Sequence, residues 1–241
     1  MRRTGSPAPS VQRTARWLAA ASVSVAALLT PVPGDVARAN ADPGCPDVKV
    51  VFARGTFEAP GIGATGQAFV DALSARLGGK NVAVEPVDYP ASLDFGRAVD
   101  GVADASTKVE ATAANCPRTK IVLGGYSQGA AVAAYTTADS VPDGISLPDG
   151  ITGPMPPAVA SNVAAVVLFA APSDAFLHFV DHSAPPINIG PLYAAKTLQL
   201  CADGDPVCSP GGRDRAAHST YRDNGMANQA AEFTRNAIVS A

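Results

Sequence analysis

IVLGGYSQGAAVAAYTT, at residues 121–137, joins a short apolar run to an alanine-rich run through a serine flanked by glycines. The apolar run 121–124 predicts a buried strand, and the alanine-rich run 127–137 predicts a helix directly after it. Between them, GYSQG at residues 125–129 matches the G-x-S-x-G pattern. In a strand–turn–helix setting this pattern places a serine hydroxyl on a tight turn above the edge of a sheet. The two glycines allow the strand and the helix to pack closely, because neither carries a Cβ atom.

Strand and helix patterns alternate along the rest of the chain. Short apolar runs predict further strands at 48–53, 82–87, 164–169 and 197–200. Apolar residues at helical spacing predict helices at 62–77 and 96–114, and a last helix with Met226, Ala230, Phe233 and Ala237 on one face. Loops rich in Pro, Gly and Asp are expected at 139–161 and 181–191. The alternation predicts an α/β fold with a central, mainly parallel five-stranded sheet, in a single domain at residues 42–241.

The composition indicates a folded, acidic protein. Of the 241 residues, 47% are hydrophobic and 16% are charged, so the chain has enough apolar material for a core and disorder is not expected. The formal net charge is −3. The basic surface that nucleic-acid binding requires is therefore not expected.

The first 41 residues have the order of residues that is typical of a secretory signal peptide. Arginines without any acidic residue precede an apolar run from Trp17 to Leu29, and two prolines follow it. Ala37-Arg38-Ala39 and Ala39-Asn40-Ala41 both offer small residues for cleavage. The alternative is a membrane anchor, but the run is too short to cross ~30 Å of hydrocarbon as a helix. Loss of the five arginines and one aspartate of residues 1–41 changes the formal charge from −3 to −7, and we expect a secreted or cell-wall-associated protein.

Export would place the four cysteines, Cys45, Cys116, Cys201 and Cys208, in an oxidising compartment where disulfides form. Four cysteines allow three pairings. Cys201 and Cys208 enclose a sequence that is typical of a turn, so a local bond between them is one option. A metal site is not favoured, because there is neither a C-x-x-C motif nor a nearby histidine pair. We therefore expect neither a metal nor a cofactor.

Ser127 needs a base to become a nucleophile, and the base needs an acid to orient it. On this fold type the order along the chain is serine, acid, histidine. No glutamate lies between residues 128 and 218, so the acid must be an aspartate. We favour Asp205 with His218, because both follow the last predicted strand and fall on the edge of the sheet that carries Ser127.

Other acid and base residues remain open at this point. Asp174 with His178 or His182 follows the fourth predicted strand, in a short amphipathic segment where a histidine needs no catalytic role. Asp203 and Asp214 are alternative acids for His218. An aspartate in a turn is more often a turn former than a catalytic group, so Asp205 is favoured only in combination with His218.

A tetrahedral intermediate also needs two hydrogen-bond donors for its oxyanion. The backbone N–H of Gln128, at the start of the predicted helix, is the first candidate. The loop Arg54-Gly55-Thr56 after the first strand offers the second. Gly55 permits a close approach of the backbone, and the Thr56 hydroxyl can add a hydrogen bond.

Together these motifs resemble the cutinase family, and in particular its actinobacterial, mycobacterial-type branch. The matching segments are FARGTFE at 52–58, GYSQG at 125–129, CADGDPVC at 201–208 and HSTYRDNGM at 218–226. The resemblance implies an α/β-hydrolase fold, a three-layer sandwich without a large lid. It also implies the triad Ser127, Asp205 and His218, the oxyanion donors Thr56 and Gln128, and the disulfides Cys45–Cys116 and Cys201–Cys208.

The function implied by the resemblance is that of a secreted serine esterase that hydrolyses carboxylic esters, including lipids or polyesters, without a cofactor. Charged residues at 213–215 precede His218 where fungal cutinases have apolar ones, so short to medium acyl chains are expected rather than cutin. Residues 182–191 are expected to supply the apolar wall of the site. An acyltransferase or thioesterase with the same triad, or an inactive surface or antigen protein, is the alternative. We expect a monomer that acts on small-molecule or lipid esters and contacts a lipid or cell-wall surface only transiently.

Overall fold

The central sheet is built from the segments whose sequence predicts strands. They are β1 (Val48–Ala53), β2 (Val82–Pro86), β3 (Lys120–Tyr126), β4 (Val163–Phe169) and β5 (Thr197–Leu200). Every neighbouring pair is parallel, in the order β2-β1-β3-β4-β5. The computed structural model describes residues 44–148 and 150–240, so the predicted signal at residues 1–41 lies outside the described residues.

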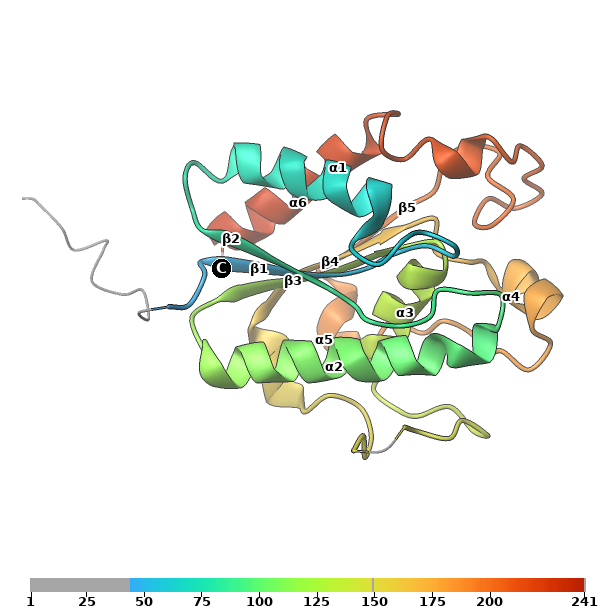
Figure 1. The fold of residues 1–241 in the computed structure, drawn as a ribbon, viewed down its shortest axis with the longest axis horizontal. Helices are drawn as coiled ribbons and strands as arrows, with labels where there is room; N and C mark the ends of the chain where they lie inside the picture. The colour runs from blue at the N-terminus through green and yellow to red at the C-terminus, as the bar shows by residue number, and fades with distance from the viewer. Residues whose placement is uncertain (1–43, 149, 241) are drawn as a thin grey trace, which may run out of the picture. The chain divides into compact units, whose positions relative to one another are not determined.

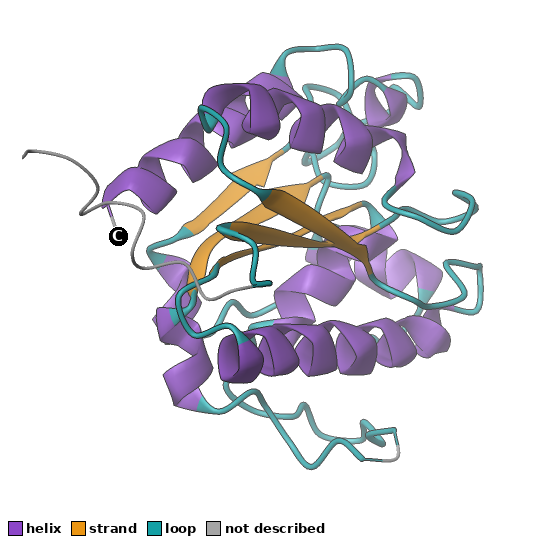
Figure 2. Ribbon diagram, turned by 60° about the vertical axis from the view of Figure 1, so that its left-hand side comes forward, coloured by secondary structure: helices purple, strands orange, loops and turns teal. Residues whose placement is uncertain are grey.

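Helices cover both faces of the sheet, as Figures 1 and 2 show. On one face lie α1 (Gly63–Arg76) and α6 (Met226–Ser240), and on the other lie α2 (Ala98–Asn115), α3 (Gln128–Thr136) and α5 (Pro191–Ala194). The short helix α4 (Asp174–Val180) follows β4. This three-layer arrangement confirms the predicted fold class. Within the described residues, no helix combines the length and the apolar character needed to span a membrane.

Each face of the sheet has its own apolar core, because successive side chains of a strand point to opposite faces. Val48, Val50 and Phe52 of β1 belong to the core under α1 and α6, whereas Val51 and Ala53 belong to the core under α2 and α3. All five are fully buried. Continuous burial of this kind is typical of a parallel sheet that is covered on both faces, and it leaves the strand ends as the places where polar groups gather.

The strand β3 is longer than the predicted run 121–124. Gly125 extends the strand because β1 and β4 pair with it on both sides. Glycine is depleted in strands, so the local sequence ends the strand too early and the tertiary pairing extends it. The helix α5 was not predicted either, although Pro191 stands at its first position, where proline is well tolerated.

Both disulfides implied by the family resemblance are present. Cys45–Cys116 joins the segment before β1 to the end of α2, over a separation of 71 residues. Cys201–Cys208 closes a loop directly after β5, over a separation of 7 residues. The two bonds therefore lie at opposite edges of the sheet, the first where the strands begin and the second where they end.

Candidate active site

The turn between β3 and α3 places Ser127 at the edge where the strands end. Ser127 has φ 56° and ψ −120°, a strained conformation for a residue with a side chain. Its N–H donates to the Phe169 carbonyl of β4 at 2.9 Å, which holds the turn against the sheet. A Cβ atom at Gly125 would lie 2.0 Å from the Gly129 carbonyl oxygen, and one at Gly129 would lie 2.1 Å from the Ala53 carbonyl oxygen. Both glycines are therefore required for this turn.

Three side chains from distant parts of the chain meet above this edge. His218 lies in the 3-10 turn Ala217–Ser219, and its Nε2 atom is 3.0 Å from the Oγ atom of Ser127. Its Nδ1 atom lies 3.0 and 2.9 Å from the two carboxylate oxygens of Asp205. Asp205 itself lies in the loop that Cys201 and Cys208 close. The imidazole thus stands between a hydroxyl and a carboxylate, which is the arrangement that allows it to act as a base.

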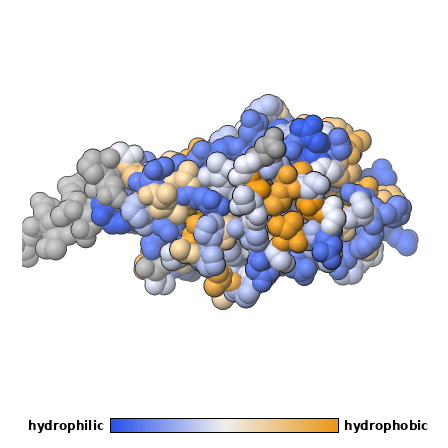
Figure 3. Space-filling model, turned by 90° about the horizontal axis from the view of Figure 1, so that it is seen from below, coloured by the Kyte–Doolittle hydropathy of each residue, from blue (hydrophilic) through white to orange (hydrophobic). Residues whose placement is uncertain are grey.

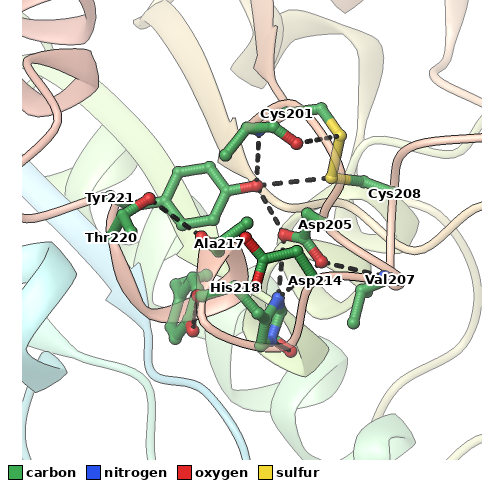
Figure 4. A network of polar contacts seen from close by, with 12 residues as sticks. Cys201, Asp205, Val207, Cys208, Asp214, Ala217, His218, Thr220 and Tyr221 are labelled. Carbon is green, nitrogen blue, oxygen red and sulfur yellow. Dashed lines mark hydrogen bonds and ion pairs between the residues drawn. A yellow bond between two sulfur atoms is a disulfide. The ribbon is translucent and has the colours of Figure 1, made fainter. Parts of the chain in front are cut away.

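The Asp205 carboxylate is fully buried. Both of its oxygens accept hydrogen bonds, as Figure 4 shows. Besides the contacts with His218, its Oδ2 atom accepts from the Tyr221 hydroxyl at 2.6 Å. Its Oδ1 atom accepts from the Val207 N–H at 2.8 Å. Burial acts to raise the pKa of this carboxyl, but these hydrogen bonds and the attraction to His218 outweigh it and hold the pKa below its ordinary value of 3.8. Asp205 is therefore ionised at neutral pH.

Tyr221 is a site residue to which the sequence reasoning gave no role. Its side chain is fully buried, and its hydroxyl accepts from the Ala202 N–H at 2.9 Å while it donates to Asp205. Burial, reinforced by the hydrogen bond to Asp205, raises the pKa of Tyr221 far above its ordinary value, so the hydroxyl stays a donor. The tyrosine stands three residues after His218, but nothing in the local sequence indicates that it reaches the carboxylate.

A second tyrosine, Tyr126, positions His218. The two rings are stacked, with centroids 5.1 Å apart and an angle of 29° between their planes. The Tyr126 hydroxyl donates to the His218 carbonyl oxygen. Tyr126 therefore holds both the ring and the backbone of the histidine from the last residue of β3.

The two expected oxyanion donors, Thr56 and Gln128, line the cavity beside Ser127. Within the described part of the chain, neither of their backbone N–H groups has an acceptor. The Thr56 hydroxyl donates to the Gln128 side-chain oxygen at 3.2 Å, and the Gln128 side-chain nitrogen donates to the Ser92 carbonyl at 3.1 Å. The hydroxyl, expected as an additional oxyanion donor, is therefore engaged with Gln128, and the two backbone N–H groups are the free donors.

The loop that carries Thr56 is held on two sides. The Glu58 carboxylate accepts from the Gly55 N–H at 2.7 Å and from the Ala64 N–H at 2.8 Å. The buried guanidinium of Arg54 donates to the Glu58 carbonyl at 2.9 Å and to the Tyr89 carbonyl at 2.6 Å. Donors that are fixed in place before a charge develops are the ones that stabilise it best.

The alternative acids and bases take no part in the contacts between Ser127, His218 and Asp205. His178 and His182 are exposed, and the Nδ1 atom of His178 is bonded to the carbonyl of Asp174 in its own helix at 2.8 Å. Asp203 and Asp214 are exposed as well. The structure therefore brings Asp205 and His218 to Ser127 and leaves the other candidates at the surface. No group of three or more His, Cys, Asp or Glu side chains in residues 44–148 and 150–240 is arranged to hold a metal ion.

A cavity of about 740 Å³ opens beside Ser127, and its lining is mostly apolar. The sequence predicts residues 182–191 as the apolar wall, but within the described residues only 183–185 of this segment line the cavity. Ile187 and Ile189 instead turn inward and pack against the core under α2 and α3. The prediction is therefore wrong for most of the wall. Much of the lining comes from α2, α3 and the loop after α3, with Leu93, Val102, Ala131, Ile145 and Met155 among the residues exposed to it.

Comparison with known proteins gives consistent matches. The family described as Cutinase matches residues 44–238. A Mycobacterium tuberculosis protein named probable carboxylesterase Culp5 is 58% identical over 165 residues, which are 68% of this chain and 92% of the relative. Phospholipase Culp4 of the same species is 43% identical over 231 residues, which are 96% of this chain and 94% of the relative. The solved structure of Trichoderma reesei cutinase with a phosphonate inhibitor matches with a TM-score of 0.58 and 33% identity, over 80% of this chain and 77% of that chain.

Proposed function

This chain belongs to the cutinase family and is a carboxylic ester hydrolase, and we propose that Ser127, His218 and Asp205 form its catalytic triad. The observation that carries the proposal is the 3.0 Å contact between Ser127 Oγ and His218 Nε2, with the Asp205 carboxylate on the other side of the ring. Family membership and the two disulfides also indicate an extracellular protein, since disulfides persist in oxidising compartments.

In the proposed mechanism, His218 takes the proton of the Ser127 hydroxyl while the serine oxygen attacks the ester carbonyl carbon. The imidazolium then gives this proton to the alcohol oxygen, the bond between this oxygen and the carbonyl carbon breaks, and an acyl-serine ester remains. A water molecule, deprotonated by His218, attacks the acyl carbon, and the carboxylic acid leaves as the serine recovers its proton. Asp205 stays ionised throughout and stabilises the imidazolium.

We assign the backbone N–H groups of Thr56 and Gln128 to the oxyanion of the tetrahedral intermediates. Their free N–H groups, their place beside Ser127 and the contact between their side chains support this assignment. Gln128 is also the first residue of α3, so the positive end of the helix dipole adds to its donor. One such donor typically contributes a factor of about 10² to 10³ to kcat.

The triad is tested with p-nitrophenyl butyrate and the Ser127→Ala variant. The expected loss of kcat is on the order of 10⁴ to 10⁶. Ser161→Ala is the matched control, because this serine is exposed in the segment before β4 and should leave the activity unchanged. Activity that survives in Ser127→Ala would refute the assignment.

We also propose that a signal peptide within residues 1–41 directs export and is removed, which leaves one monomeric domain, at residues 42–241, that acts on short- to medium-chain esters. The order of basic, apolar and small residues supports the first part, and the apolar cavity beside Ser127 supports the second. N-terminal sequencing of the protein from the culture medium should find chains that begin at Asn40 or Asp42. A chain in the medium that still begins at Met1 would contradict removal of the signal.

A further inference from the structure

The cavity beside Ser127 continues away from the triad along two helices. On α3, Gln128, Ala131 and Tyr135 line it at successive turns. On α2, Val99, Val102 and Ser106 do the same. Residues three or four apart share one face of a helix, so each set forms a stripe along its helix.

Both helices begin at the edge of the sheet that carries the triad and run toward the opposite edge. α3 starts directly after Ser127. Ser92, shortly before α2, accepts a hydrogen bond from the Gln128 side chain, so α2 also starts near the site. α2 ends before Cys116, whose disulfide joins Cys45 just before β1, where the sheet begins. The cavity therefore extends farther from the triad as the residue numbers rise along α2.

The length of the cavity along the two helices follows from the helix rise per residue. From Gln128 to Tyr135, and from Val99 to Ser106, each helix advances about 10 Å at roughly 1.5 Å per residue. An extended hydrocarbon advances about 1.25 Å per carbon, since its bonds are about 1.5 Å long and meet at near-tetrahedral angles. A chain of about eight carbons spans this distance.

The loop after α3 forms an apolar outer wall. Val141, Ile145 and Met155 line the cavity from this loop. The face on which the loop lies is seen in Figure 3, where a patch of hydrophobic residues is surrounded by hydrophilic ones. A hydrocarbon chain inside the cavity would therefore meet apolar side chains on several sides.

The acyl chain of the ester, rather than its alcohol, fits the direction in which the cavity extends along α2 and α3. His218 must protonate the leaving alcohol oxygen, so the alcohol lies on the His218 side of the site. Polar residues, Ser219 and Arg222, line the cavity there. The acyl chain leaves the carbonyl carbon in another direction, and the apolar helices α2 and α3 offer the surface for it.

We propose that α2 and α3 form an acyl channel for chains of about eight to ten carbons, and that Val99, Val102 and Ser106 mark its depth. The channel rests on the proposed triad, because the acyl carbon must sit at Ser127. Each methylene that enters the channel should raise kcat/KM roughly fourfold, the ratio that corresponds to burial of one CH₂ group. Chains longer than the channel should gain nothing more.

The test measures kcat/KM for p-nitrophenyl esters from acetate to palmitate in Val99→Phe, Val102→Phe and Ser106→Phe. For each variant, kcat/KM on every ester is divided by its kcat/KM on the acetate. The cut-off of a variant is the acyl chain length beyond which this ratio no longer rises. The cut-off should be shortest in Val99→Phe, longer in Val102→Phe and longest in Ser106→Phe, and none should exceed the roughly eight to ten carbons of the wild-type channel. Thr107→Phe is the matched control on α2, because Thr107 is exposed and should keep the wild-type profile.

Equal cut-offs in the three variants, or an order that does not follow the helix, would overturn the channel. Ser127→Ala tests the triad separately, so the two failures are distinguishable. A series of alkyl acetates, in which only the alcohol chain grows, should show no such order, and an ordered cut-off there would also overturn the proposal. Because Ser106 is buried, Ser106→Leu replaces Ser106→Phe if the larger residue prevents folding, with the same expected order.

Discussion

The two disulfides of this chain close very different regions of the same sheet. Cys45–Cys116 encloses a long segment that contains β1, α1, β2 and α2, and it lies where the strands begin. Cys201–Cys208 encloses a short loop where the strands end, and the buried Asp205 carboxylate lies inside that loop. The long loop spans much of the fold, and the short loop carries the carboxylate that we propose for the triad.

From this difference we expect stability and catalysis to depend on different cross-links. The chain-entropy model assigns about 4 kcal/mol of unfolding free energy to the long loop and about 2.5 kcal/mol to the short one. Because Asp205 orients His218, the effects of the two bonds on kcat should run in the opposite order. The predictions below test this contrast, from the largest expected effect to the smallest.

Asp205→Asn should remove the negative charge that the short loop presents to His218, while the Cys201–Cys208 disulfide stays intact. The substitution keeps the shape of the side chain but loses the charge that orients and stabilises the imidazolium, so kcat should fall by about 10⁴. Asp203→Asn, at an exposed position of the same loop, is the control and should keep wild-type kcat. Steady-state kinetics on a p-nitrophenyl ester would check this, and near-normal turnover in Asp205→Asn would remove the basis of the contrast.

Removal of the long cross-link in Cys45→Ala/Cys116→Ala should lower the unfolding free energy by about 4 kcal/mol. The bond is far from Ser127 along the strands, so kcat should stay unchanged while the protein is folded. Urea unfolding and kinetics at low urea measure the two quantities on one sample. A loss of kcat without a loss of stability would contradict the structural role of this bond.

Removal of the short cross-link in Cys201→Ala/Cys208→Ala should cost less stability and more activity. The unfolding free energy should fall by about 2.5 kcal/mol. A freed loop displaces Asp205, and a displacement on the order of 1 Å can lower kcat up to about 100-fold. Full kcat in the folded double variant would show that the loop positions the carboxylate without its disulfide.

Tyr221→Phe should have the smallest effect, because it removes one hydrogen bond from Asp205 and leaves the loop closed. The folded pKa of Asp205 lies below its ordinary 3.8, so the stability it contributes is present above that pH and is lost as the pH falls through the folded pKa. Without the Tyr221 hydroxyl, the folded pKa should move up toward 3.8, so the loss of stability should be smaller and should be complete at a higher pH. At neutral pH the variant should also lose about 1.5 kcal/mol.

Urea unfolding at several pH values between about 2 and 6 measures this shift in Tyr221→Phe. Tyr193→Phe is the matched control, because the Tyr193 hydroxyl is buried with no hydrogen-bond partner among the described residues. Loss of the Tyr193 hydroxyl should leave the acid limb, which is the fall of the unfolding free energy at low pH, as it is in the wild type. Identical acid limbs in wild type and Tyr221→Phe would mean that Tyr221 does not set the pKa of Asp205.

The features of the fold that depend on residues close together in the sequence could be predicted from it. The turn at Ser127 combines a strand, two glycines and a helix within a few residues, so its form follows from local chemistry. Asp205 and His218 were predictable because the ends of parallel strands meet at one edge. The paired disulfides, in contrast, were implied by resemblance and not by the residues alone.

The features that depend on packing between distant segments could not be predicted. The Tyr221 hydroxyl reaches Asp205 only because the chain folds back after the second disulfide, and the Tyr126 ring meets His218 across 92 residues. The apolar wall was misassigned because the inward packing of Ile187 and Ile189 has no local signal. In the sequence, the stripe of α2 that faces the cavity looks like any stripe that faces a core.

Labelling with a fluorophosphonate probe tests the central claim, that His218 activates the Ser127 hydroxyl, most directly. Peptide mass spectrometry should find one adduct, on Ser127, and the labelling rate should fall strongly in His218→Ala. An adduct on another residue, or an equal labelling rate in His218→Ala, would contradict the account.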